Sequence, residues 1–377
     1  MDSCHKHLLK LLHFQWFPLL LFPCALFVMS KTQAQELAKQ KASNNSIEAI
    51  FVFGDSTADP GNNNYVSTVF KANFAPYGRD FPNQVPTGRF SNGRLGNDFI
   101  ASYVGIKDYV PPYLDPTLSI EELMTGVSFA SAASGFDPLT PKLTNVISLP
   151  KQLEYFKECQ KRVELVAGSK RTKKMVENAL YIISTAGTND FVVNYFGVPI
   201  RRKRYSLPSY MEFLLQQVQE FIQDLLDQGA RRIGVVGLPP MGCLPIVITV
   251  NSENAILNRG CVEFFSLVAR QYNLMLQTML NTMQSKLFAS GVRILYIDAY
   301  GPISDMIFQG LKYNFDEVGD GCCGTGLLET SFLCNPASYI CSDASKYVFW
   351  DSIHPSEKAY KILFEAAKSD IDFLIAD

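Results

Sequence analysis

The sequence predicts one α/β domain in which helices cover both faces of a central parallel sheet. Short apolar runs alternate with longer stretches of helical periodicity, and the runs are continuously apolar rather than alternating. Continuous runs are typical of strands that are buried on both faces, as they are in a parallel sheet covered by helices. No linker-like change of composition and no internal repeat divides the chain. We therefore expect a single domain over residues 48–377.

Five strands and six main helices account for most of this domain. The expected strands cover residues 50–53, 126–130, 179–186, 232–237 and 292–298. The expected helices cover residues 95–103, 149–166, 208–228, 261–288 and 357–374, with one more from residue 302. A flavodoxin-like strand order 2-1-3-4-5, in a three-layer fold, would bring the carboxyl ends of the strands to one rim. Open α/β sheets bind their ligands at such a rim.

The first 34 residues have the layout of a cleaved signal peptide. Lys6 and Lys10 precede an apolar run over residues 14–29, and Thr32-Gln33-Ala34 offers a small-residue cleavage site. A membrane anchor is the alternative, but the run is short for a span and holds two prolines. We expect a secreted, extracellular protein without a stable membrane anchor. Residues 35–47 would form a polar leader, in which Asn44 begins the one N-glycosylation sequence.

Composition and charge exclude several classes of function. The chain is 47% hydrophobic and 19% charged, with a net charge of −2. Cleavage after residue 34 would remove three lysines and one aspartate, which leaves −4 and no basic excess for nucleic acid. It would also remove His5, His7 and His13, so that His354 is the one histidine of the mature chain. Multi-histidine metal sites are therefore excluded. We expect no metal or other cofactor, and a monomer.

Seven cysteines would remain after cleavage, namely Cys159, Cys243, Cys261, Cys322, Cys323, Cys334 and Cys341. In an oxidising compartment most of them should pair, and Cys159, alone in a helical stretch, is the expected odd one. A zinc site built from the last four is the alternative. The vicinal pair Cys322-Cys323 lacks the usual C-x-x-C spacing, which favours disulfides.

Ser56 is the candidate nucleophile, because Phe53-Gly54-Asp55-Ser56 reads as a buried strand that runs into a turn. A serine hydroxyl needs a base to take its proton, and the base needs an orienting acid. His354 is the available base, and Asp351 precedes it by three residues, within reach of its ring. Asp298, at the end of the last strand, is the alternative acid. The plain alternative for Ser56 is a helix N-cap.

Three donors could stabilise the oxyanion of a tetrahedral intermediate. They are the backbone N–H groups of Ser56 and Gly93 and the side-chain amide of Asn189. Gly93 precedes the helix expected from residue 95, and Asn189 follows the third expected strand. The alternatives are a turn glycine for Gly93 and a capping pair for Asn189-Asp190. For Asp190 the capping role is the favoured one.

The chain resembles the plant GDSL esterase/lipase family of the SGNH hydrolases, over nearly the whole mature chain and in the same order. The matching blocks are Phe53-Gly54-Asp55-Ser56, Pro60-Gly61-Asn62-Asn63-Asn64-Tyr65, Gly88-Arg89-Phe90-Ser91-Asn92-Gly93-Arg94, Gly187-Thr188-Asn189-Asp190-Phe191, Gly237-Leu238-Pro239-Pro240-Met241-Gly242-Cys243, Cys322-Cys323-Gly324 and Phe349-Trp350-Asp351-Ser352-Ile353-His354-Pro355. The resemblance implies that Ser56, Asp351 and His354 are catalytic and that Ser56, Gly93 and Asn189 form the oxyanion hole. Two positions depart from the family pattern: Thr57 stands for leucine, and Gly96-Asn97 stands for a hydrophobic-Pro pair.

Together these features predict a secreted serine esterase or lipase that works through an acyl-enzyme. Its substrate would be an ester of a lipid, an acylated small molecule or an acylated polysaccharide. An acyltransferase with the same triad, or a secreted binding protein that has lost catalysis, are the alternatives. The aromatic loop over residues 70–90 suggests either an apolar acyl pocket or core packing. The basic run of residues 201–204 reads as a solvated loop, with an anionic surface contact as the alternative.

Overall fold

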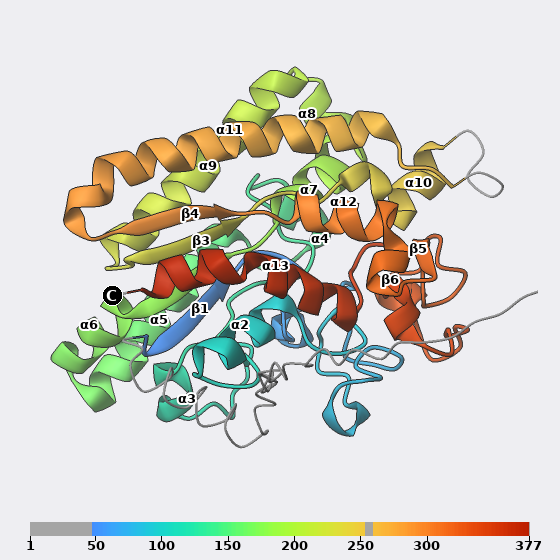
Figure 1. The fold of residues 1–377 in the computed structure, drawn as a ribbon. Coiled ribbons are helices and arrows are strands. Elements are labelled where there is room, and N and C mark those ends of the chain that lie inside the picture. Colours follow the sequence, from blue (N-terminus) through green and yellow to red (C-terminus); the bar gives the residue numbers. More distant parts are fainter. Residues whose placement is uncertain (1–46, 253–258, 377) are drawn as a thin grey trace, which may run out of the picture.

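Four parallel strands form the central sheet in the computed structural model, which describes residues 47–252 and 259–376. They are β1 (Ala49–Phe53), β2 (Ala179–Ile183), β3 (Arg232–Val236) and β4 (Arg293–Ile297), in the order β1-β2-β3-β4. Each neighbouring pair is parallel. The parallel α/β fold predicted from the sequence is confirmed (Figure 1).

The strand predicted at residues 126–130 runs beside β1 but does not form a regular strand. Val52 donates to the carbonyl of Val127 (3.1 Å) and accepts from the N–H of Phe129 (2.8 Å), and one parallel bridge joins Val52 to Ser128. On its other side Ser128 bridges Pro112: the Ser128 N–H donates to the carbonyl of Pro111 and the Ser128 carbonyl accepts from the N–H of Tyr113, both at 2.9 Å. This placement is consistent with the predicted order 2-1-3-4-5 without establishing it.

The main helices lie where the periodicity predicts them. They are α2 (Gly96–Val104), α5 (Leu149–Ala167), α9 (Leu207–Asp227), α11 (Glu263–Leu287), α12 (Tyr300–Phe308) and α13 (Glu357–Ile375). Serine caps begin three of them, because the Ser148, Ser206 and Ser356 side chains each accept a backbone N–H of the first turn. Within the described residues, further shorter helices were not predicted: α3 (Ile120–Met124), α4 (Thr140–Thr144), α6 (Ser169–Glu177), α7 (Gly187–Asn189), α8 (Pro199–Arg202) and α10 (Pro245–Asn251).

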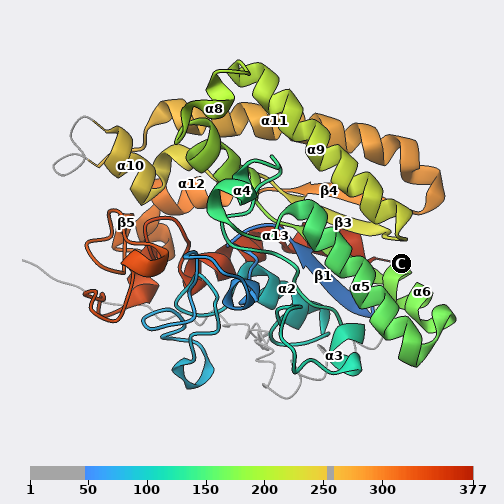
Figure 2. The same cartoon turned by 180° about the vertical axis from the view of Figure 1, so that it is seen from behind.

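Two helical layers enclose the sheet (Figures 1 and 2). One core lies under α5, α9 and α11, where the ring of Phe51 lies 5.0 Å from that of Phe156. The other core lies under α2 and α13, where Ile50 and Val52 share a cluster with Phe364. Alternate side chains of β1 thus enter opposite cores, which is why this strand is apolar at every position.

A small second sheet pairs β5 (Glu317–Gly321) with β6 (Tyr347–Phe349), and the sequence did not predict it. Two disulfides, Cys322–Cys341 and Cys323–Cys334, cross-link the segment between these strands. The zinc alternative is therefore wrong, because these four cysteines have no thiolate to offer. A third disulfide joins Cys243 to Cys261. Among the cysteines that the structure describes, Cys159 is the free one, and it is buried, as expected.

Part of the basic run of residues 201–204 does not form the solvated loop that was predicted for it. Arg201 lies in α8 and its guanidinium makes a two-pronged ion pair with the fully buried Asp137, at 2.5 and 2.6 Å. A buried carboxylate needs such a partner, and this one comes from a segment distant in sequence. The prediction is wrong for Arg201, whereas residues 202–204 are exposed.

Within the described residues, no helix is both long and apolar enough to cross a membrane. The predicted signal peptide, most of the polar leader and Asn44 lie outside those residues.

Candidate active site

Ser56 lies in the turn that follows β1, and the local backbone needs a glycine there. Gly54 has a φ of 129°, which L side chains rarely adopt. A Cβ at Gly54 would also collide with the Ser184 hydroxyl at the end of β2. The chain can therefore leave the sheet sharply, which brings the next residues to the carboxyl rim. Ser56 itself is 7% exposed.

Gln152 of α5 holds this turn from behind. Its Oε1 accepts the N–H of Gly54 and its Nε2 donates to the carbonyl of Gly54, both at 2.9 Å. The side chain is completely buried, next to Leu149, Leu153 and Phe156 on the apolar face of α5. Sequence reasoning missed Gln152. A polar residue at a core position of an amphipathic helix is the signal that could have found it.

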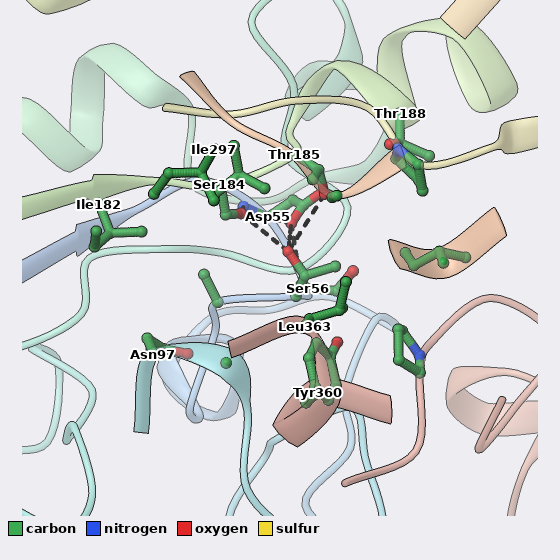
Figure 3. A pocket seen from close by; sticks show the side chains of 18 of the residues that line it. Asp55, Ser56, Asn97, Ile182, Ser184, Thr185, Thr188, Ile297, Tyr360 and Leu363 are labelled. Atoms are coloured by element: carbon green, nitrogen blue, oxygen red, sulfur yellow. Dashed lines mark hydrogen bonds between the residues drawn. The ribbon is translucent and has the colours of Figure 1, made fainter. Parts of the chain in front are cut away.

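The carboxylate of Asp55 anchors the residue just before Ser56. It accepts the Thr57 N–H (3.0 Å), the Thr57 hydroxyl (2.7 Å) and the Ser184 hydroxyl (2.9 Å). Thr185 adds a longer contact at 3.4 Å. Figure 3 shows the group of Asp55, Ser184 and Thr185 beside Ser56. Thr57, where the family pattern has leucine, therefore uses its hydroxyl to hold the turn.

His354 lies against Ser56 at the other side of the turn. Its Nε2 is 2.7 Å from the Ser56 Oγ, and its Nδ1 is 2.8 Å from each carboxylate oxygen of Asp351. Because a carboxylate only accepts, Nδ1 carries the proton in this pair, which leaves Nε2 to accept from the serine. The structure thus brings together Ser56, His354 and Asp351.

Asp351 is fully buried and has four further donors. Its carboxylate accepts from the hydroxyls of Tyr77 (2.7 Å) and Thr330 (3.0 Å) and from the N–H groups of Ile353 (2.9 Å) and His354 (2.8 Å). Burial raises the pKa of Asp351, but the neighbouring His354 and these hydrogen bonds outweigh burial and leave the pKa below its ordinary value. Asp351 is thus a carboxylate at neutral pH. Sequence reasoning missed Tyr77 and Thr330, which come from distant loops.

Gly93 lies in a loop that is fastened to the start of α13, the helix that begins three residues after His354. The Asn92 side chain accepts the N–H of Glu357 (2.8 Å), and Arg94 pairs with the Glu357 carboxylate (2.8 Å). A Cβ at Gly93 would meet that carboxylate, so a larger residue there would require the Glu357 side chain to shift. The Gly93 N–H donates to the Ser91 hydroxyl at 3.2 Å. To donate to an oxyanion it must leave or share this partner.

Asn189 ends α7, the short turn after β2, and its amide donates to the carbonyl of Ser134 at 2.9 Å. An amide has two N–H groups, so one remains for a ligand. The neighbouring Asp190 is buried and accepts from the N–H groups of Phe136 and Asp137. Burial raises the pKa of Asp190 well above its ordinary value. Asp190 thus ties two loops together and so holds Asn189 in place.

Ser56 and Asn189 line one cavity, with a volume of about 1030 Å³ that includes the part open to solvent. Its walls are mainly apolar side chains from the sheet and from α13, such as Ile182, Ile297 and Leu363 (Figure 3). The aromatic loop does not supply these walls. Its buried members Tyr77 and Phe90 pack instead with Trp350 in a separate cluster.

Asp298, the alternative acid, also lines this cavity but has a different role. It is exposed, and it accepts the N–H groups of Tyr300 (2.9 Å) and Gly301 (3.2 Å) at the start of α12. The carboxylate that meets His354 is that of Asp351.

The site thus consists of a serine hydrogen-bonded to a histidine, which is hydrogen-bonded to a buried carboxylate, at the carboxyl rim of a parallel sheet. This is the arrangement of a serine hydrolase. The profile of the GDSL-like lipase/acylhydrolase family matches residues 50–367. The Arabidopsis thaliana protein GDSL esterase/lipase At5g45960 is 54% identical over 346 residues, which cover 92% of each chain. GDSL esterase/lipase At1g58430 of the same plant is 46% identical over 84% of this chain and 87% of its own. The chain belongs to the GDSL esterase/lipase family and is an ester hydrolase.

Proposed function

We propose that this hydrolase cleaves carboxylic esters through an acyl-enzyme formed on Ser56. The observation that carries the proposal is the 2.7 Å contact between Ser56 Oγ and His354 Nε2, continued by the 2.8 Å contacts from Nδ1 to Asp351. A base within hydrogen-bond reach of a hydroxyl, itself oriented by a buried carboxylate, is what activates a serine.

In the first half of the reaction, Ser56 Oγ attacks the ester carbonyl carbon while its proton passes to His354 Nε2. The tetrahedral intermediate then collapses. The bond to the leaving oxygen breaks, and that oxygen takes the proton from Nε2 and departs as the alcohol. Asp351 stabilises the imidazolium that forms in between.

In the second half, a water molecule gives a proton to Nε2 as its oxygen attacks the acyl carbon. The bond to Ser56 Oγ breaks, and Oγ regains the proton. One ester and one water molecule thus give one carboxylic acid and one alcohol. The backbone N–H of Ser56 has no acceptor among the described residues, which leaves it for the oxyanion. The N–H of Gly93 and the free N–H of Asn189 are the other donors we propose.

The substrate we propose is an ester of a lipid, an acylated small molecule or an acylated polysaccharide. The largely apolar walls of the cavity support an apolar acyl group. Secretion is part of the proposal. The charged and apolar layout of residues 1–34 and the three disulfides support secretion. We further propose that residues 48–377 are the hydrolase domain, that Asn44 is glycosylated and that the protein is a monomer.

Labelling with a fluorophosphonate tests the nucleophile on the purified secreted protein. We expect the wild-type chain to be labelled once and to hydrolyse a p-nitrophenyl ester. Ser56→Ala should lose the label and lower kcat by a factor on the order of 10⁴–10⁶. Ser345→Ala, at an exposed position away from the site, is the matched control and should behave as wild type. Unchanged labelling of Ser56→Ala would refute the assignment. Transfer of the acyl group to an added alcohol in preference to water would identify an acyltransferase.

A further inference from the structure

The cavity at Ser56 continues from the rim into the space between the sheet and the layer formed by α2 and α13. Its inner walls include Ile100 of α2, Ile297 of β4 and Phe364 of α13. An unbranched acyl chain attached to Ser56 can lie in such a space and contact apolar side chains along its length. The chemistry of the few polar groups on the walls then decides which chains are preferred.

Asn97 is the polar group that stands out there. It lies in the first turn of α2, is 4% exposed, and lines the cavity. Neither its Oδ1 nor its Nδ2 has a hydrogen-bond partner in the structure. Figure 3 shows its side chain directed toward the interior of the pocket, on the same side as Tyr360.

Tyr360 of α13 adds a second orphaned group on this wall. It is 4% exposed, and its hydroxyl has no partner either. Burial raises the pKa of this hydroxyl well above its ordinary value, and the Asp55 and Asp351 carboxylates raise it further. The hydroxyl is therefore neutral. The same carboxylates disfavour an anionic ligand beside it and favour a neutral one.

Two buried polar side chains without partners are costly, and folded proteins rarely keep them without a reason. Leucine and phenylalanine at positions 97 and 360 would fill similar volumes and leave nothing unsatisfied. Gly96-Asn97 also stands where the family pattern has a hydrophobic-Pro pair. Residues that lower stability in this way are typical of binding sites.

We propose that Asn97, assisted by Tyr360, hydrogen-bonds a hydroxyl group carried on the acyl chain of the substrate. The proposal rests on the esterase function proposed for Ser56 and names its substrate class as esters of hydroxylated aliphatic acids. A hydroxyl both donates and accepts, as do the Asn97 amide and the Tyr360 hydroxyl. An unsubstituted chain would leave these groups unpaired, and sites built for a hydroxyl discriminate against ligands that lack it.

The test uses 4-methylumbelliferyl dodecanoate and a series of its isomers that carry one hydroxyl at successive chain positions. For the wild-type protein we expect at least one isomer to be cleaved with a kcat/KM about tenfold or more above that of the parent ester. Asn97→Leu should bring that ratio to within about twofold of one, and Tyr360→Phe should lower it. Ser102→Ala, on the exposed side of α2, is the control and should keep the wild-type ratio.

The thermal midpoint supplies a second readout. Asn97→Leu should melt at the wild-type temperature or higher, because it removes an unsatisfied buried amide, whereas a structural asparagine would lower the midpoint on removal. Wild-type cleavage of the parent ester with no favoured isomer would overturn this inference and leave the esterase function standing. A preference that persists in Asn97→Leu would overturn it too. If no ester is cleaved and no fluorophosphonate is bound, the proposed function fails and the inference with it.

Discussion

The two halves of the candidate site are held in place by different means. The Ser56 half is part of the regular fold, since its turn follows a central strand and is gripped through the backbone by Gln152. The Asp351–His354 half lies in irregular chain. Its neighbours are the β5–β6 sheet, the disulfide-linked segment 322–341 and the Tyr77 loop.

Backbone contacts show how closely the second half depends on the cross-linked segment. The N–H of Cys322 donates to Phe349 and that of Cys323 donates to Trp350, at 3.1 and 2.9 Å, just before Asp351. Ser352 in turn donates to the carbonyl of Glu329 at 2.8 Å. Ser56 is thus placed by the core and the Asp351–His354 pair by a disulfide-linked scaffold, so substitutions in the two halves should have different effects.

After the loss of Ser56 itself, loss of the proposed acid should have the largest effect. Asp351→Asn keeps an acceptor for Tyr77 and Thr330 but no longer stabilises the imidazolium or its working tautomer. We expect kcat for a p-nitrophenyl ester to fall by a factor on the order of 10⁴ with the fold retained. Asp298→Asn is the matched control and should stay within about threefold of wild type. A larger loss in Asp298→Asn than in Asp351→Asn would reverse the choice of acid.

Loosening the turn that carries Ser56 should have the next largest effect. Gln152→Leu leaves the buried N–H of Gly54 without an acceptor, while the Gly54 carbonyl keeps the N–H of Ser131 at 3.0 Å. We expect a loss of about 1–3 kcal/mol in the free energy of unfolding. We also expect kcat to fall about 10- to 100-fold with little change in KM, because Ser56 is misplaced.

Gln160→Leu, farther along α5, is the control for that substitution. The Nε2 of Gln160 has no partner, so its loss should leave both kcat and stability near wild type. Equal effects of the two substitutions would show that the Gln152 contacts do not hold the turn.

Removing a cross-link should affect the other half of the site. The Cys323–Cys334 disulfide spans 11 residues, and replacing both cysteines by serine should lower the free energy of unfolding by about 2–4 kcal/mol. We expect kcat to fall several-fold at temperatures where the variant is still folded. Cys243→Ser with Cys261→Ser should cost similar stability, yet change kcat less, because that bridge lies at the start of α11. Equal losses of kcat would contradict the division into two halves.

The smallest effect concerns Cys159, which belongs to neither half. Burial raises the pKa of its thiol to about 12, so the thiolate is scarce at pH 8. We expect iodoacetamide to leave the native protein unmodified and fully active. After denaturation without reductant, the chain that begins after residue 34 should take up one label, which mass spectrometry would assign to Cys159. Modification of the native protein would show that this core opens readily.

Some features of the protein follow from the sequence alone because they are local. Continuous apolar runs predicted the strands β1 to β4, and 3.6-residue periodicity predicted the main helices. The position of Ser56 after a buried strand, and of Asp351 three residues before His354, was likewise readable along the chain. The same local reading failed at residues 126–130, where Ser128 forms isolated bridges to Val52 and Pro112 and no regular strand results.

Only the tertiary structure decided what holds and surrounds these residues. Gln152 reaches Gly54 across 98 residues, and Tyr77 reaches Asp351 across 274. Arg201 pairs with Asp137, and Asn97 lies inside a cavity without a hydrogen-bond partner. No local sequence pattern predicted either observation. Hydrogen-bond satisfaction and burial depend on which segments the fold brings together. The residues of the proposed chemistry were therefore visible in the sequence, while the contacts that hold them became visible only in three dimensions.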